Sequence, residues 1–157
     1  MTKDKVWTKI LKILTVILLG YHLIHLILLW TDVPANIAIH FTNGEPDNWG
    51  SKYFLLIMPV TGFLTWWSLG VLIKHPEKLN YINLTEENRD KQHKMTSKIL
   101  VVIQNLPFIM FIFGNEAFLK YAIGDGNYIF LFLSIFSLVL VLLVLFYNLV
   151  WAARLKA

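Results

Sequence analysis

Five side chains suited to acid–base or metal chemistry lie in or beside the first and third long apolar stretches of the sequence. His22 and His25 are three residues apart in the first stretch, so a helix would place them on one face. Glu116 lies near the end of the third stretch, and His40 and Asp47 lie in the connection that follows the first. Ionisable groups within membrane helices are costly, and each is therefore a functional candidate. We predict that these groups meet beneath that connection, with Glu116 hydrogen-bonded to His25 or His40.

Such a cluster permits more than one function. Imidazole and carboxylate groups suit zinc, and His25, His40, Asp47 and Glu116 are the candidate ligands, although the sequence has no compact ligand motif such as H-E-x-x-H. The same groups could serve a proton path or simply join neighbouring helices by hydrogen bonds. Asn105, about three helical turns before Glu116, shares its predicted face. Haem is disfavoured, because histidines occur in only one apolar stretch.

The elements that carry these residues are predicted to be membrane helices. Of the 157 residues, 57% are hydrophobic and 15% are charged, whereas soluble domains have about 25% charged residues. Cysteine is absent, which excludes disulfides, thiolate catalysis and cysteine metal sites. A membrane span needs about 20 apolar residues. Residues 7–30, 53–73, 99–121 and 128–151 meet this length, so we predict an all-α four-helix membrane bundle forming one domain over residues 1–157.

The basic residues predict the orientation of these spans. Twelve Lys and Arg residues lie within the first 12 residues, between the second and third spans, and after the fourth, against two (Lys52 and Lys120) at the opposite ends of the spans. Basic residues favour the cytoplasmic side of a membrane. Both termini and the middle connection are therefore predicted to be cytoplasmic, and the net charge of +4 requires no nucleic-acid partner. In the middle connection, Thr85 is predicted to cap a helix that continues into the third span.

The first connection is rich in residues that form turns. Asn43-Gly44 is a favoured tight-turn pair, and Pro46 is a second turn residue. Asp47 can accept hydrogen bonds from nearby backbone amides, and Trp49 is expected at the membrane surface. We therefore expect an ordered loop at this end of the bundle.

Two motifs resemble one bacterial membrane family. The first connection carries a long pattern of spaced residues, and a shorter stretch, residues 79–92, resembles the same family. The long pattern is Pro34-x-x-Ile37-x-x-His40-Phe41-x-x-x-Gly44-x-Pro46-Asp47-x-Trp49-Gly50-x-Lys52. It resembles a membrane domain of unknown function that occurs in SdpI-like proteins, which confer immunity against a secreted toxin.

The resemblance implies a multi-pass protein of the bacterial cytoplasmic (inner) membrane. It also implies a non-enzymatic role in toxin immunity, envelope stress or signalling, with a secreted toxin or a membrane protein as partner in addition to the lipid bilayer. The loop residues implied to be functional are His40, Asn43, Gly44, Pro46, Asp47, Trp49 and Lys52. Two alternatives remain open: a metal-dependent or proton-coupled protein that uses the His/Asp/Glu cluster, and a small structural subunit of a membrane complex.

Overall fold

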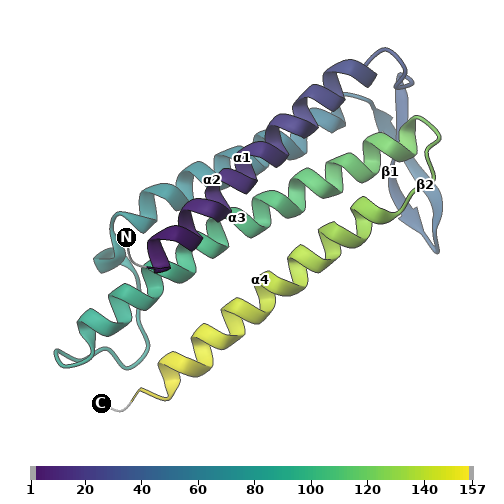
Figure 1. The fold of residues 1–157 in the computed structure, drawn as a ribbon. Coiled ribbons are helices and arrows are strands. Elements are labelled where there is room, and N and C mark those ends of the chain that lie inside the picture. Colours follow the sequence, from purple (N-terminus) through teal and green to yellow (C-terminus); the bar gives the residue numbers. More distant parts are fainter. Residues whose placement is uncertain (1–2, 156–157) are drawn as a thin grey trace.

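The computed structural model describes residues 3–155 and consists mainly of four long helices (Figure 1). The helices are α1 (Lys3–Leu29), α2 (Phe54–Ile73), α3 (Arg89–Ala122) and α4 (Ile129–Ala153). All four are long and apolar enough to cross a membrane, in agreement with the four predicted spans. A short 3₁₀ helix, η1 (Pro76–Lys78), follows α2.

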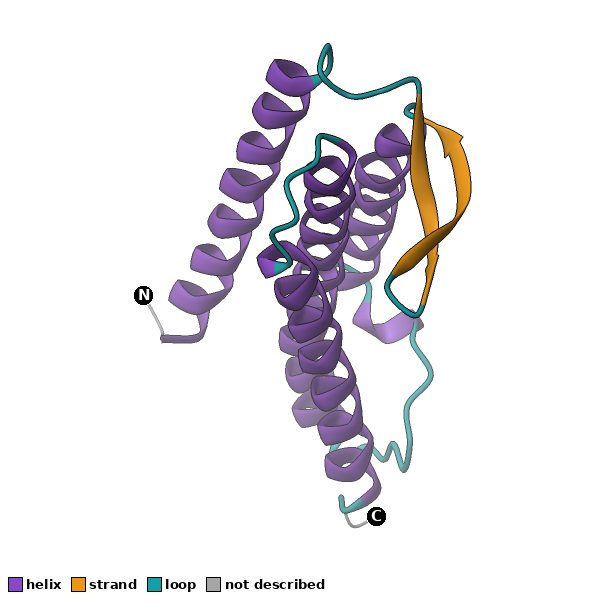
Figure 2. Ribbon diagram, turned by 90° about the vertical axis from the view of Figure 1, so that its right-hand side faces the viewer, coloured by secondary structure: helices purple, strands orange, loops and turns teal. Residues whose placement is uncertain are grey.

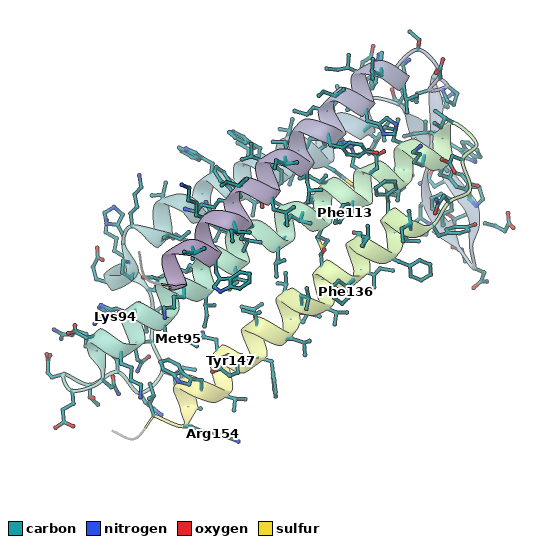
Figure 3. All side chains as sticks on the ribbon, in the orientation of Figure 1. Lys94, Met95, Phe113, Phe136, Tyr147 and Arg154 are labelled. Atoms are coloured by element: carbon teal, nitrogen blue, oxygen red, sulfur yellow. The ribbon has the colours of Figure 1, made fainter. Side chains whose placement is uncertain are left out.

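Helix α1 begins and helix α4 finishes at the same end of the molecule (Figure 1). The connection between α1 and α2 and the turn between α3 and α4 lie at the other end. We call this the hairpin end, because the first of these connections contains the β-hairpin described below. Lys94 on α3 and Arg154 after α4 lie at the opposite end (Figure 3). This arrangement agrees with an even number of spans and gathers basic residues from distant parts of the sequence at one end.

Helix α3 is the centre of the fold, because it packs against each of the other three helices, which make few contacts with one another. With 34 residues, it would be about 51 Å long, which exceeds the roughly 30 Å hydrocarbon core of a bilayer. Its buried residues include five polar ones: Gln92, Gln104, Asn105, Asn115 and Glu116. The polar interior of the protein is therefore concentrated on a single helix.

Part of the first connection forms a β-hairpin, so the expectation of an all-α fold with a loop was incomplete. Strands β1 (Asn36–Thr42) and β2 (Glu45–Ser51) pair antiparallel and pack beside the helices (Figure 2). Asn43 and Gly44 have φ angles of 54° and 85°. Positive φ at both positions is the requirement of the type I′ turn that joins twisted strands in two-residue hairpins. The expected tight turn at this pair is confirmed, and it organises a sheet.

The hairpin is fixed to the helices by an apolar cluster. The cluster consists of Leu26 from α1, Val33 before β1, Ile37 from β1, Leu55 from α2 and Leu119 from α3, each at most 4% exposed. Close to it, Phe41 of the hairpin packs edge-on against Tyr121 of α3. The hairpin is thus held by three of the four helices.

The helix predicted to start at Thr85 begins later. Helix α3 starts at Arg89, after a turn in which the Thr85 amide donates to Asn88 Oδ1 at 3.0 Å and the Asn88 amide donates to Thr85 Oγ1 at 3.3 Å. Gln92 then donates from Nε2 to the carbonyl of Ile82 at 2.9 Å, which holds the connection against the helix. Thr85 therefore caps a turn before the helix, and α3 continues unbroken into the third span as predicted.

Candidate functional site

The carboxylate of Glu116 lies between the two histidines of α1. His22 donates from Nδ1 to Glu116 Oε2 at 2.6 Å, and His25 donates from Nδ1 to Glu116 Oε1. Glu116 and His22 are almost completely buried, whereas the His25 side chain is 21% exposed. The predicted contact between Glu116 and His25 is confirmed, and His22 joins it because residues three apart share a helix face.

Asn115 fixes the proton position on His22. Its Nδ2 donates to the Leu55 carbonyl at 2.7 Å and also lies 2.8 Å from His22 Nε2. A backbone carbonyl can only accept, so the nitrogen of the amide must face both groups. His22 Nε2 therefore accepts, and His22 is a neutral imidazole that carries its proton on Nδ1, directed at Glu116. We call His22, His25, Asn115 and Glu116 the buried cluster.

The charge of the buried cluster depends on His25. With His22 neutral, an ionised Glu116 needs one positive charge nearby, because an unpaired buried charge is destabilising by several kcal/mol. A protonated His25 supplies that charge. His25 is also the cluster member with access to the surroundings, and the ring of Tyr21 lies beside it at a centroid distance of 5.4 Å.

A small cavity adjoins the cluster on the other side of Asn115. Its volume is about 110 Å³, and Asn115 is the polar residue in a wall formed otherwise by apolar side chains of β1, α2 and α3. A bound water needs two to four polar partners, and this half-open pocket offers one polar side chain. Proton exchange with the buried cluster is therefore expected through the exposed side of His25.

The other two predicted members form a separate site on the hairpin, so the prediction of one five-membered cluster is wrong. His40 donates from Nδ1 to Asp47 Oδ1 at 2.5 Å, and Thr42 donates from its hydroxyl to Asp47 Oδ2. His40 and Asp47 are 64% and 41% exposed. The hydrogen bond from Thr42, then that from His40, lowers the pKa of Asp47. We call these three residues the hairpin site.

The geometry of the hairpin site results from an irregular register. The pairs on both sides keep one register, Ala38 with Trp49 and Phe41 with Pro46, but between them His40 pairs with Asn48 in place of Asp47. An irregularity of this kind redirects side chains relative to the ladder. Asp47 consequently reaches side chains of the facing strand, where we had expected hydrogen bonds from backbone amides.

The zinc candidates are divided between the two sites. Within residues 3–155, no group of three or more His, Asp or Glu side chains is arranged to hold a metal ion. His25 and Glu116 bind each other in the buried cluster, whereas His40 and Asp47 bind each other on the hairpin. The four residues therefore do not converge on one position.

Asn105 belongs to a third polar layer, between α2 and α3. The indole nitrogen of Trp66 donates to Asn105 Oδ1 at 3.2 Å, and Asn105 Nδ2 donates to the Val101 carbonyl at 2.7 Å. Gln104 donates from Nε2 to the Trp66 carbonyl at 2.9 Å. This layer ties α2 to α3 and is not joined to Glu116, despite the shared helix face.

Lys52 connects the hairpin to the end of α1. Its Nζ donates to the carbonyls of Trp30 at 3.1 Å and Val33 at 3.3 Å, and lies 4.7 Å from the centroid of the Trp30 ring. A positive charge beside the carbonyls at a helix C-terminus is stabilising. Trp49, by contrast, is 59% exposed, and Pro46 lies opposite Phe41 in the sheet.

One residue of the buried cluster and one of the hairpin site were absent from the predicted set. Asn115 precedes Glu116 directly, and a second buried polar residue beside an intramembrane carboxylate was a usable signal. Thr42 became identifiable only with the hairpin, because it faces Asp47 from the other strand.

Comparison with protein families finds a match in the first half of the chain. Residues 16–63 match the family model DUF1648, a domain of unknown function. The matched segment includes His22, His25 and the hairpin, whereas Asn115 and Glu116 lie outside it. No curated protein and no solved structure matches the chain at a significant level.

Proposed function

We propose that this chain is a non-enzymatic, multi-pass protein of the bacterial cytoplasmic membrane that acts in envelope signalling and responds to protons through the buried cluster. Both termini and the middle connection are cytoplasmic in this proposal, and the hairpin faces outward. The observation that carries the proposal is the carboxylate of Glu116 held between His22 and His25 within membrane-spanning helices. Ionisable groups in such positions are typical of proton-dependent membrane proteins.

A sensor fits the polar residues better than a proton conductor. Between Asn105 and Glu116, residues 106–114 of α3 supply only apolar side chains and a glycine. Eleven residues of helix rise by about 16 Å, whereas a hydrogen bond joins atoms about 3 Å apart. The two polar layers are therefore too far apart on α3 to pass a proton directly.

Release of a proton from His25 provides the switch. The ionised Glu116 would then lack its buried counter-charge, and the contact between α1 and α3 would weaken. Tyr21 is a titratable group that contacts the cluster from α1, and α2 contributes the Leu55 carbonyl. Because α1 packs mainly on α3, loss of this contact would shift α1 more easily than any other helix.

Spin labels can test this switch without background, because the chain has no cysteine. Labels on Trp7→Cys of α1 and Lys94→Cys of α3 report the distance between the two helices at the opposite end. We expect different distance distributions at about pH 6 and about pH 9. Glu116→Gln should abolish the difference, and Asp47→Asn, the matched change in the hairpin site, should preserve it. Identical distributions at both pH values in the otherwise unchanged chain would refute the proposal.

Toxin immunity is a second candidate function, favoured by the resemblance of the hairpin sequence to SdpI-like proteins. In this function the exposed Trp49 is a candidate contact for a secreted toxin, because interface hot spots are enriched in tryptophan. Sensitive bacteria that produce the chain should survive a purified toxin of that family, and Trp49→Ala should reduce survival. Equal killing of producing and non-producing cells would exclude this function.

A further inference from the structure

We propose that the hairpin end binds one zwitterionic phospholipid, with an acyl chain in a groove between α3 and α4 and the headgroup on Lys120 and Asp125. The groove has a volume of about 380 Å³ and mostly apolar walls from the hairpin, α2, α3 and α4. Ligand sites commonly have volumes of roughly 300–1,000 Å³ and mainly apolar walls with a few polar groups. This inference is independent of the proton response of the buried cluster.

Small residues on α3 make room for the acyl chain of the lipid. Gly114 and Ala117 line the groove, and neither carries a side chain that could fill it. Ser134 of α4 also lines it, but its hydroxyl donates to the Met110 carbonyl at 3.0 Å. The polar group on this wall is therefore already satisfied, and the surface offered to an occupant is apolar.

The polar groups lie at one edge of the groove. Asp125, in the turn between α3 and α4, is part of the lining, and Lys120 Nζ lies 3.1 Å from Asp125 Oδ2. The hydrogen bond from Lys120, then one from the backbone of Asn127, lowers the pKa of Asp125, so it stays ionised at neutral pH. A fixed pair of opposite charges is complementary to a headgroup that carries both: phosphate binds Lys120 and ammonium binds Asp125.

The surroundings identify the bilayer as the source of this ligand. Next to the groove, Phe132 of α4 is 67% exposed, as expected for a side chain that faces lipid. Tyr128, which lines the groove at the start of α4, is 58% exposed. Tyrosine is enriched at the level of the headgroups. The apolar part of the groove thus lies at acyl-chain depth and the ion pair at headgroup depth.

Native mass spectrometry of the full chain, purified in mild detergent with added dioleoyl phosphatidylethanolamine, tests the groove. We expect about one retained lipid per chain. Ala117→Phe should reduce retention at least about tenfold, because the ring fills the space. Ala153→Phe makes the same change at an exposed position of α4 outside the groove and should retain the lipid. Equal retention by the two variants, or retention of detergent alone by the unchanged chain, would overturn the proposal.

Asp125→Asn tests the headgroup without changing the walls of the groove. An ethanolamine ammonium can donate hydrogen bonds to Asp125, whereas the quaternary ammonium of phosphatidylcholine cannot. The unchanged chain should therefore retain phosphatidylethanolamine in preference to phosphatidylcholine, and Asp125→Asn should lose this preference. Absence of any preference in the unchanged chain, or an undiminished preference in Asp125→Asn, would contradict the headgroup assignment.

Discussion

The protein contains two histidine–carboxylate sites that differ mainly in their surroundings. In the buried cluster, Glu116 of α3 is 1% exposed and both of its partners come from α1. In the hairpin site, Asp47 is 41% exposed and its partners come from the facing strand of one hairpin. Water stabilises the members of the hairpin site when they are apart, whereas separation of the buried cluster leaves polar groups without partners. The buried cluster should therefore contribute strongly to the stability of the fold, whereas the hairpin site should contribute little.

The largest effect is expected from removal of the buried carboxylate. Glu116→Ala leaves His22 and His25 without their common acceptor, and loss of one partner from a buried ionic network typically lowers the free energy of unfolding by about 3–5 kcal/mol. Unfolding in detergent, followed by circular dichroism, measures this change. Asp47→Ala removes the corresponding carboxylate from the hairpin site and should have a much smaller effect. Similar losses of stability in the two variants would mean that burial does not make the buried cluster more important for stability than the hairpin site.

A smaller loss is expected when the tautomer of His22 is no longer fixed. Asn115→Leu leaves the Leu55 carbonyl without a side-chain donor, and a buried unsatisfied group costs about 1–3 kcal/mol. Nitrogen NMR of the imidazole should show a single neutral tautomer of His22, protonated on Nδ1, in the unchanged chain and a mixture in Asn115→Leu. Asn105→Leu, which removes the corresponding amide from the middle layer, should leave the His22 signal unchanged. A His22 protonated on Nε2 in the unchanged chain would contradict the assignment.

Sequence patterns predicted the helices better than the contacts between them. Apolar length located the four spans, and the identity of Asn43-Gly44 determined the tight turn. The contact of Glu116 with His25 followed from their similar predicted depth. The position of Asn115 against Leu55, however, depends on how α3 is rotated relative to α2, which side-chain packing sets and periodicity alone does not.

The hairpin shows why the remaining site residues were assigned incorrectly. Ile37, Ile39 and Phe41 alternate with less apolar residues, which favours a strand, but the turn residues that follow dominated the prediction of a loop. The contact of His40 with Asp47 depends further on the irregular register between β1 and β2. A change of register by one residue moves side chains to the other face of a strand. The local sequence therefore did not reveal which carboxylate His40 would reach.

Lys52 extends the comparison of the two histidine–carboxylate sites, because it joins the hairpin to α1 near the buried cluster. Lys52→Met keeps the apolar stem and removes the hydrogen bonds to the Trp30 and Val33 carbonyls. We expect a loss of about 1–2 kcal/mol in the free energy of unfolding, within the range for hydrogen bonds that involve a charged group. Lys94→Met at the exposed opposite end should change stability by less than about 0.5 kcal/mol. If Lys52→Met is equally neutral, the hairpin is anchored by its apolar cluster alone.

The smallest effect is expected from Asp47→Asn, and its dependence on pH identifies the cause. The pKa of Asp47 in the folded protein lies below its ordinary value of 3.8, so folding favours the ionised form. The resulting stabilisation is present at neutral pH and disappears as the pH falls below the ordinary value and through the lowered one. Because the site is exposed, Asp47→Asn should lower the melting temperature at neutral pH by no more than about 2 °C. At about pH 3, where the unfolded carboxyl is mostly protonated, the difference between the two chains should shrink. A difference that stays constant between the two pH values would show that the Asp47 charge is not its source, and that the side chain acts in the hairpin through its shape.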